Sequence, residues 1–179
     1  FVGESFFKIY LVDYNSNEKN LKRIEDKVKE YFSEFELFNL NLNDFEKKIK
    51  KTNEKNEKVS LNQISNMSNI YKSFELSKDS ASDLFYFVED DYIHEENALL
   101  EMILTYERIS SQIKDEIIIC PSDYPYLYMN NDKANILIGN KRHWRTVSKT
   151  LCTFLTSHKL INKYWTNFYN NCLDRHDPF

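Results

Sequence analysis

Short apolar runs alternate along the chain with longer segments in which apolar residues recur every three or four positions. Runs rich in aromatic and β-branched residues predict strands, and the helical spacing predicts helices. The predicted strands cover residues 6–12, 35–42, a run that ends at Val88, 116–120, 135–139 and 151–155. The predicted helices cover the apolar positions from Leu21 to Phe32, then residues 61–78, 95–109 and 160–169. The lysine-rich segment 44–58 is predicted to be a solvated helix and loop.

This alternation predicts an α/β fold with a mainly parallel central sheet flanked by helices, a Rossmann-like arrangement. The short strands after Pro121 predict a small antiparallel addition at one edge of that sheet. The length of 179 residues predicts one domain that spans 1–179. The apolar start and the end in the middle of a polar motif indicate a domain truncated at one or both ends.

Three consecutive carboxylates, Glu89, Asp90 and Asp91, follow the strand that ends at Val88. Ligands of open α/β sheets bind just beyond the carboxyl ends of the strands. Adjacent carboxylates repel one another unless a cation lies between them, and a hard divalent ion suits oxygen ligands. The run therefore predicts a site for Mn²⁺ or Mg²⁺. A simpler alternative is that acidic residues follow strands because loops are solvated, and that Glu95 and Glu96 begin a helix.

Composition excludes several classes of protein. The chain has two glycines and neither a GxGxxG nor a P-loop motif, which disfavours dinucleotide-binding and P-loop enzymes. A net charge of −4 gives no overall attraction to nucleic acid. No apolar stretch is long enough to form a transmembrane segment. Three cysteines without metal-ligand spacing indicate reduced thiols in a cytoplasmic protein.

The order of motifs resembles a known family. A strand ending in the polar turn 13–16 precedes a helix, a strand and a second helix that carries Asn69-Ile70-Tyr71, and the strand ending in Glu89-Asp90-Asp91 follows. This order is similar to that of the nucleotide-sugar-dependent glycosyltransferases of the A-type fold, especially the inverting family 2. The resemblance covers the chain from about Lys8 to Asp177, and its most specific part is residues 86–92. The family usually has a nucleotide-binding strand and helix upstream, for which this chain has no room.

The resemblance implies a metal-dependent transfer of a sugar from a nucleotide-diphosphate-sugar, of UDP type, to an acceptor hydroxyl on a glycan or a lipid-linked molecule. The acidic motif would hold the metal on the diphosphate through Asp90 and Asp91, with Glu89 nearer the sugar or ribose. The nucleoside would be contacted by Asp13, Asn15 and Ser16. A role in polysaccharide biosynthesis, in the cytoplasm and peripheral to the membrane, follows from the same resemblance.

Two later segments carry candidate substrate contacts. Residues 120–128 combine Asp123 with Tyr124 and Tyr126, whose rings suit stacking on sugars; a rigid packed turn is the alternative. Residues 142–145 are Arg142, His143, Trp144 and Arg145. The arginines suit a diphosphate and the indole suits a sugar face, although a solvated surface loop has the same composition.

The resemblance also places chemistry at the C-terminal end. A carboxylate after the last helix would be the general base of an inverting enzyme, with Asp174 favoured and Asp177 second. His176 would complete the metal shell. A retaining mechanism would need no such base, and the sequence leaves both open. Two rivals remain: a sugar nucleotidyltransferase, and a non-catalytic carbohydrate- or protein-binding module that kept the fold.

Overall fold

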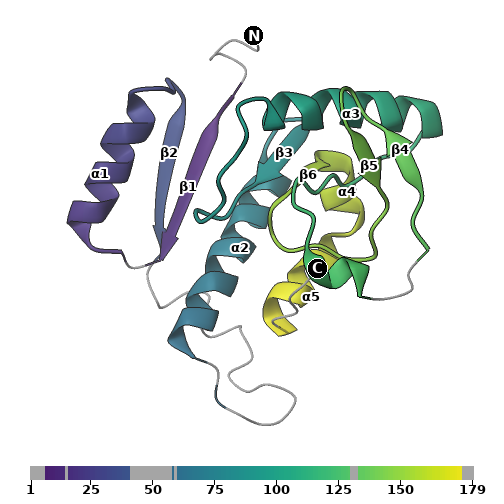
Figure 1. Cartoon of the computed structure of the whole chain (residues 1–179). Coiled ribbons are helices and arrows are strands. Elements are labelled where there is room, and N and C mark those ends of the chain that lie inside the picture. The colour runs from purple at the N-terminus through teal and green to yellow at the C-terminus, as the bar shows by residue number, and fades with distance from the viewer. Residues whose placement is uncertain (1–6, 15, 41–57, 59, 130–132, 175–179) are drawn as a thin grey trace. The chain divides into compact units, whose positions relative to one another are not determined.

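The computed structural model describes residues 7–14, 16–40, 58, 60–129 and 133–174. The chain divides into two compact units, whose helices and strands are labelled in Figure 1. Unit 1 consists of Phe1–Leu76 and Thr166–His176, and unit 2 of Ser77–Trp165 with Asp177–Phe179. Each unit is described by itself below.

Unit 1 begins with a β-α-β arrangement. Strand β1 (Ile9–Tyr14) and strand β2 (Phe35–Leu40) are parallel and in register from the pair Ile9–Phe35 to the pair Tyr14–Leu40. Helix α1 (Glu18–Lys29) connects them and begins at Asn17, whose side-chain oxygen accepts the Asn20 N–H at 2.9 Å. This cap satisfies one of the backbone donors that the first turn of a helix leaves without a partner.

The second part of unit 1 is a pair of helices, which are most of α2 (Leu61–Asp79) and most of α5 (Trp165–Asp174). Their contact is aromatic: the rings of Phe74 and Phe168 lie 4.9 Å apart, and those of Tyr71 and Tyr169 lie 5.6 Å apart. The buried apolar residues of α2 recur at helical spacing, which explains why the sequence predicts this helix well. They are Ile64, Met67, Ile70 and Phe74.

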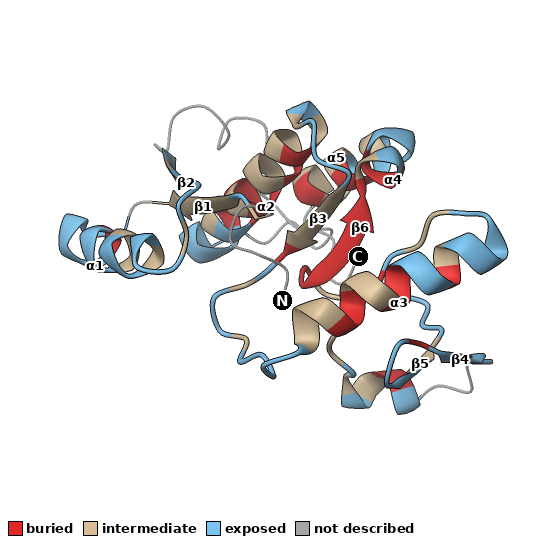
Figure 2. Cartoon of the chain, turned by 90° about the horizontal axis from the view of Figure 1, so that it is seen from above, coloured by how far each residue is buried: buried red, intermediate tan, exposed pale blue. Residues whose placement is uncertain are grey.

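Unit 2 is built around helix α3 (Ala98–Ile113). Strands β3 (Leu84–Phe87) and β6 (Phe154–Ser157) form an antiparallel pair, and β6 leads directly into helix α4 (His158–Lys163). A core of Met102, Tyr106, Ile119 and Leu155 joins α3 to this sheet. On the other side of α3 lies a hairpin of β4 (Ile136–Ile138) and β5 (His143–Arg145), preceded by the 3₁₀ helix η2 (Pro125–Tyr128) (Figure 2). Helix α3 therefore lies between two small sheets.

The predicted mainly parallel central sheet is wrong. The described residues form one two-stranded parallel sheet, β1–β2, and two separate two-stranded antiparallel sheets, β3–β6 and β4–β5. The run 116–120 contributes only an isolated antiparallel bridge between Ile119 and Leu155, because Pro121 follows at once and cannot donate a ladder hydrogen bond. Apolar periodicity identifies strands, but it does not show which strands pair.

Other elements match their prediction more closely. Helix α2 covers the predicted range 61–78, whereas α3 begins three residues later than predicted, at Ala98. The predicted helix 160–169 is two helices, α4 and α5, which meet at Tyr164. The predicted segment 44–58 lies outside the described residues except for Lys58.

Candidate functional site

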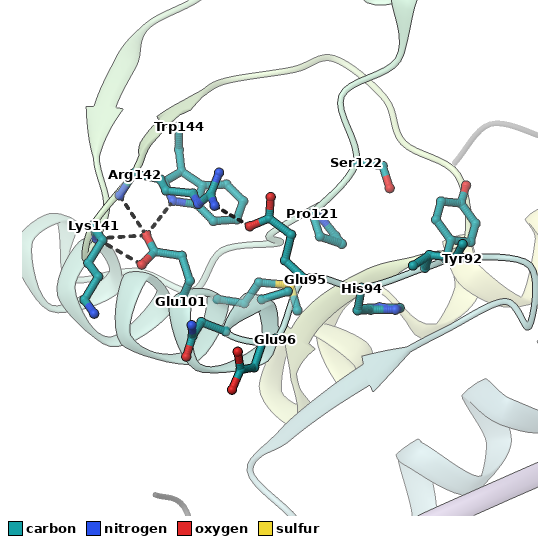
Figure 3. A pocket seen from close by; sticks show the side chains of 14 residues that line it. Tyr92, His94, Glu95, Glu96, Glu101, Pro121, Ser122, Lys141, Arg142 and Trp144 are labelled. Carbon is teal, nitrogen blue, oxygen red and sulfur yellow. Dashed lines mark hydrogen bonds and ion pairs between the residues drawn. The ribbon is translucent and has the colours of Figure 1, made fainter.

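Unit 2 contains a pocket of about 780 Å³ (Figure 3). Its walls come from the loop after β3, the first turn of α3, the loop after Ile119 and the β4–β5 hairpin. The lining combines aromatic, acidic, basic and small polar side chains. It includes Tyr92, Ile93, His94, Glu95, Glu96, Glu101, Met102, Pro121, Ser122, Lys141, Arg142 and Trp144.

The wall formed by the hairpin is held in place by the buried carboxylate of Glu101. Both of its oxygens accept the backbone N–H of Lys141, at 2.9 and 3.1 Å, and one accepts the backbone N–H of Arg142 at 3.1 Å. The Trp144 indole N–H donates to it at 3.4 Å, and the Asn140 amide donates at 3.2 Å. Glu101 is only 7% exposed, so these bonds satisfy a charge that burial alone would penalise.

Two further residues of α3 bind the same loop. The Thr105 hydroxyl donates to Glu101 at 3.1 Å and accepts the backbone N–H of Asn140 at 3.0 Å. The Arg108 guanidinium donates to the carbonyl of Gly139 at 3.1 Å. Residues 101, 105 and 108 lie on one face of the helix, because residues that are three or four positions apart are neighbours on a helix surface. This polar face of α3 fixes the position of the hairpin loop and of the pocket wall that the loop carries.

Hydrogen bonding also sets the ionisation of Glu101. Burial raises the pKa of a carboxyl group, but here the bonds from Lys141, Trp144, Arg142 and Asn140 outweigh burial, and the pKa of Glu101 lies below its usual value. Glu101 is therefore an ionised acceptor with its lone pairs engaged, which suits anchoring rather than proton transfer.

Because Glu101 is ionised in the folded protein, we expect the fold to become less stable at acidic pH. A carboxyl whose folded-state pKa is lowered stabilises the fold above its unfolded value, here about 4.5, and this contribution is lost as the pH falls through the folded-state pKa. We expect the free energy of unfolding, measured by urea titration, to decrease as the pH falls from about 6 to about 3. Glu101→Gln, which carries no ionisable carboxyl, should show a shallower decrease. An unchanged slope in that variant would show that other carboxyls account for the acid effect.

The loop between β3 and α3 is attached to the rest of unit 2 by two tyrosines. The Tyr86 hydroxyl lies 2.5 Å from His94 Nε2, and the Tyr92 hydroxyl is hydrogen-bonded to the Tyr124 hydroxyl. Burial, with the nearby Tyr124, raises the pKa of Tyr86 to about 12, so this phenol stays protonated at neutral pH. These contacts hold Tyr92 and His94 at the pocket wall.

Arg142 and Glu95 form an ion pair across the pocket. Both side chains are well exposed, at 63% and 69%, so water competes with the pair. Exposed ion pairs of this kind contribute about 0–1 kcal/mol. The Arg142 guanidinium can therefore exchange Glu95 for another anion at little cost.

The predicted metal site is wrong. Glu89, Asp90 and Asp91 lie in a turn directly after β3, in which the Tyr92 N–H contacts the Glu89 carbonyl, and Asp90 and Asp91 are exposed. Within the described ranges, which exclude His176, no group of three or more His, Cys, Asp or Glu side chains could hold a metal ion. Solvation is the simpler account of these carboxylates, and the predicted Mn²⁺ or Mg²⁺ has no supporting ligand cluster.

The predicted segment 120–128 forms a compact group with Arg145 of the hairpin. Asp123 Oδ1 accepts Arg145 Nη2 at 2.6 Å, and Asp123 also accepts the Tyr128 hydroxyl. Arg145, together with Tyr128, holds the pKa of Asp123 below its usual value despite some burial. The rings of Tyr124 and Tyr126 are stacked 5.5 Å apart. These contacts are those of a rigid packed turn, which was one of the two alternatives for residues 120–128; the other was stacking on a sugar.

The remaining predicted residues belong to unit 1 or lie outside the described residues. In unit 1, Asp13 accepts the backbone N–H of Ser16 at 2.9 Å, so it closes the turn before α1. Asp174 is the last residue of α5. His143 is exposed on β5 in unit 2, whereas Asn15, His176 and Asp177 lie outside the described residues.

Of the predicted residues, the pocket brings together Arg142 and Trp144 and leaves out Arg145, Asp123 and the acidic triplet. The sequence interpretation missed Glu101, His94 and Lys141. One signal for Glu101 was available: it interrupts the apolar pattern of α3 at a position that helical spacing places in line with Thr105 and Arg108.

No protein-family model, curated protein or solved structure matches the chain. None of the helices in the described part of the chain is both long and apolar enough to span a bilayer.

Proposed function

We propose that the chain is a glycosyltransferase that binds a nucleotide-diphosphate-sugar, of UDP type, in the pocket of unit 2 and transfers the sugar to an acceptor hydroxyl. The pocket itself carries this proposal, because one cavity of about 780 Å³ is lined by an indole ring, two cations and several carboxylates. Aromatic faces stack on sugars, carboxylates accept sugar hydroxyls and cations bind diphosphates.

In this proposal Lys141 and Arg142 take the role that a metal would otherwise have. Fixed cations stabilise the negative charge that develops on a departing diphosphate. The backbone of both residues is anchored by Glu101, so their side chains start from one defined position at the pocket wall. Arginine is suited to the task because its guanidinium binds two phosphate oxygens at once.

Exchange of partners by Arg142 would also supply a base. When the guanidinium turns to the diphosphate, it leaves the carboxylate of Glu95 unpaired within the same pocket. Glu95 would then accept the proton of the attacking acceptor hydroxyl, as a general base does. Binding of the sugar nucleotide would therefore free the carboxylate of Glu95 from its ion pair in the same step.

The test is calorimetric titration of UDP and GDP in the presence of EDTA. We expect metal-free binding to wild type that Arg142→Gln weakens roughly tenfold, since one charge-assisted contact is lost. Arg23→Gln, an exposed arginine of α1, is the matched control and should bind like wild type. Binding that requires added Mn²⁺, or that is equally weakened by both variants, would contradict the proposal.

A non-catalytic sugar-binding module is the second candidate. It is favoured by the saturation of Glu101, because the most deeply buried carboxylate of the pocket has no free lone pair for proton transfer. Such a module would bind free sugars without nucleotide and would not hydrolyse or transfer from a UDP-sugar. Donor turnover that Glu95→Gln reduces about a hundredfold would exclude it.

A further inference from the structure

One face of the β4–β5 hairpin carries two exposed aliphatic side chains, Ile136 and Ile138. Cross-strand pairing sets Ile136 opposite Arg145 and Ile138 opposite His143, so these four side chains lie on one face. Trp144, on the opposite face, points toward Glu101 of α3. Ile136 is 65% exposed and Ile138 is 60% exposed, although both are aliphatic residues in a strand. This face, formed by Ile136, Ile138, His143 and Arg145, is called the hairpin surface below. Figure 2 shows the β4 ribbon mainly in the colour of exposed residues.

The same segment is strongly basic in an otherwise acidic chain. Residues 133–149 contain five lysines and arginines and no aspartate or glutamate, whereas the whole chain has a net charge of −4. Two of the five are paired with acidic residues from outside the segment, Arg142 with Glu95 and Arg145 with Asp123. The ionised carboxylate of Glu101, bound to the backbone of residues 141 and 142, is a third acidic group, so five cations against three carboxylates leave two positive charges. Lys133 and Lys149, which flank the hairpin, lie outside the two ion pairs.

We propose that the hairpin surface docks on an anionic lipid bilayer. Acidic lipids attract basic segments at the membrane surface, and the attraction amounts to about fivefold in affinity for each lysine. Exposed aliphatic side chains gain further by leaving water for the boundary between headgroups and acyl chains. The two isoleucines of β4 and the two lysines that flank the hairpin, Lys133 and Lys149, supply these two contributions.

The aliphatic side chains favour a bilayer over a nucleic acid. Single-stranded RNA or DNA is bound by basic grooves with aromatic rings on which bases stack. On this hairpin Trp144 is turned inward, and the Arg145 guanidinium lies 4.1 Å from the centre of the Tyr128 ring and covers one of its faces. Nothing in a nucleic acid would cover Ile136 and Ile138, whereas a lipid surface would.

The experiment is co-sedimentation of the full chain with phosphatidylcholine vesicles that contain or lack phosphatidylserine. We expect binding only to the anionic vesicles, weakened by added salt. Replacing Ile136 and Ile138 together by asparagine should lower the partition coefficient about tenfold. Replacing Lys133 and Lys149 by glutamine should lower it about fivefold for each residue. Lys141 stays unchanged because it lines the pocket.

Two matched controls separate the hairpin from general surface effects. Leu61→Asn with Ile113→Asn removes two exposed aliphatic side chains elsewhere, which are 67% and 54% exposed. Lys19→Gln with Lys22→Gln removes two exposed lysines of α1. Both controls should sediment like wild type.

Three results would overturn the proposal: no sedimentation, equal sedimentation with neutral vesicles, or anionic binding that the hairpin variants leave unchanged. Filter binding of a single-stranded RNA provides the last comparison. RNA binding that the lysine variants abolish, without vesicle binding, would assign the surface to nucleic acid instead. No sugar nucleotide is present in these assays, so their outcome is independent of the proposed glycosyl transfer.

Discussion

Replacing Glu101 by alanine is expected to lower the free energy of unfolding by about 2–4 kcal/mol, since several buried donors lose their acceptor at once. The backbone N–H groups of Lys141 and Arg142 and the indole N–H of Trp144 all donate to this carboxylate. Each donor left without a partner in a buried site costs about 1–3 kcal/mol, and water entering the gap would recover part of that. Urea unfolding gives the change in free energy, and amide exchange at residues 141 and 142 shows where it arises.

Glu107→Ala is the matched control for this variant. Glu107 lies on the same helix but is exposed, so its loss should change the free energy of unfolding by about 0.5 kcal/mol or less. Glu101→Gln should fall between the two, because the amide keeps one acceptor oxygen and turns its own N–H groups toward other donors. Equal stability of Glu101→Ala and Glu107→Ala would mean that the hairpin does not depend on the carboxylate.

Gly139→Ala is expected to cost about 1–3 kcal/mol, a typical penalty for forcing an extra methyl group into a packed site. A Cβ atom added to Gly139 would lie 2.5 Å from Thr105 Oγ1 and would overlap the Trp144 ring. The clash is steric, because Gly139 does not have a positive φ. Relief requires the hairpin loop to move away from α3, which would also disturb the pocket wall formed by residues 141 and 142.

The double variant with Thr105→Ala tests this explanation. Removing the Thr105 side-chain oxygen gives the new methyl group more room, so the cost of Gly139→Ala should be smaller in that background. Thermal unfolding of the four proteins of the cycle measures the coupling. Strictly additive effects would show that Gly139 and Thr105 do not meet, and that glycine is required at this position for another reason.

The sequence predicted the individual elements better than their assembly. Helix α2 was predicted within one residue because its apolar positions recur over five turns, a pattern that no strand produces. Strand β3 was recognised from its aromatic run, but nothing in four residues specifies that its partner β6 runs antiparallel. That pairing depends on contacts between residues about 70 positions apart, such as Tyr86 with Leu155, which periodicity does not report.

The same limit applies to the site. Trp144 and Arg142 stood out as residue types suited to sugars and phosphates, and both line the pocket. The acidic triplet stood out more strongly, but the structure leaves two of its members exposed in a turn. Glu101 lay unnoticed in the first turn of an amphipathic helix, since its importance comes from backbone groups 40 residues away. A site that depends on main-chain N–H donors is therefore difficult to recognise from the residue types in the sequence.

The position of Trp144 has a practical consequence. The chain has only two tryptophans, and the other, Trp165, has the ammonium group of Lys78 4.4 Å from its ring. Substituting Trp165 by phenylalanine would leave a single indole, whose N–H contacts a carboxylate and whose ring lines the pocket. Its emission would respond to any molecule that displaces water from that wall. The chain therefore contains an intrinsic optical probe of pocket occupancy, which needs neither a label nor a known ligand.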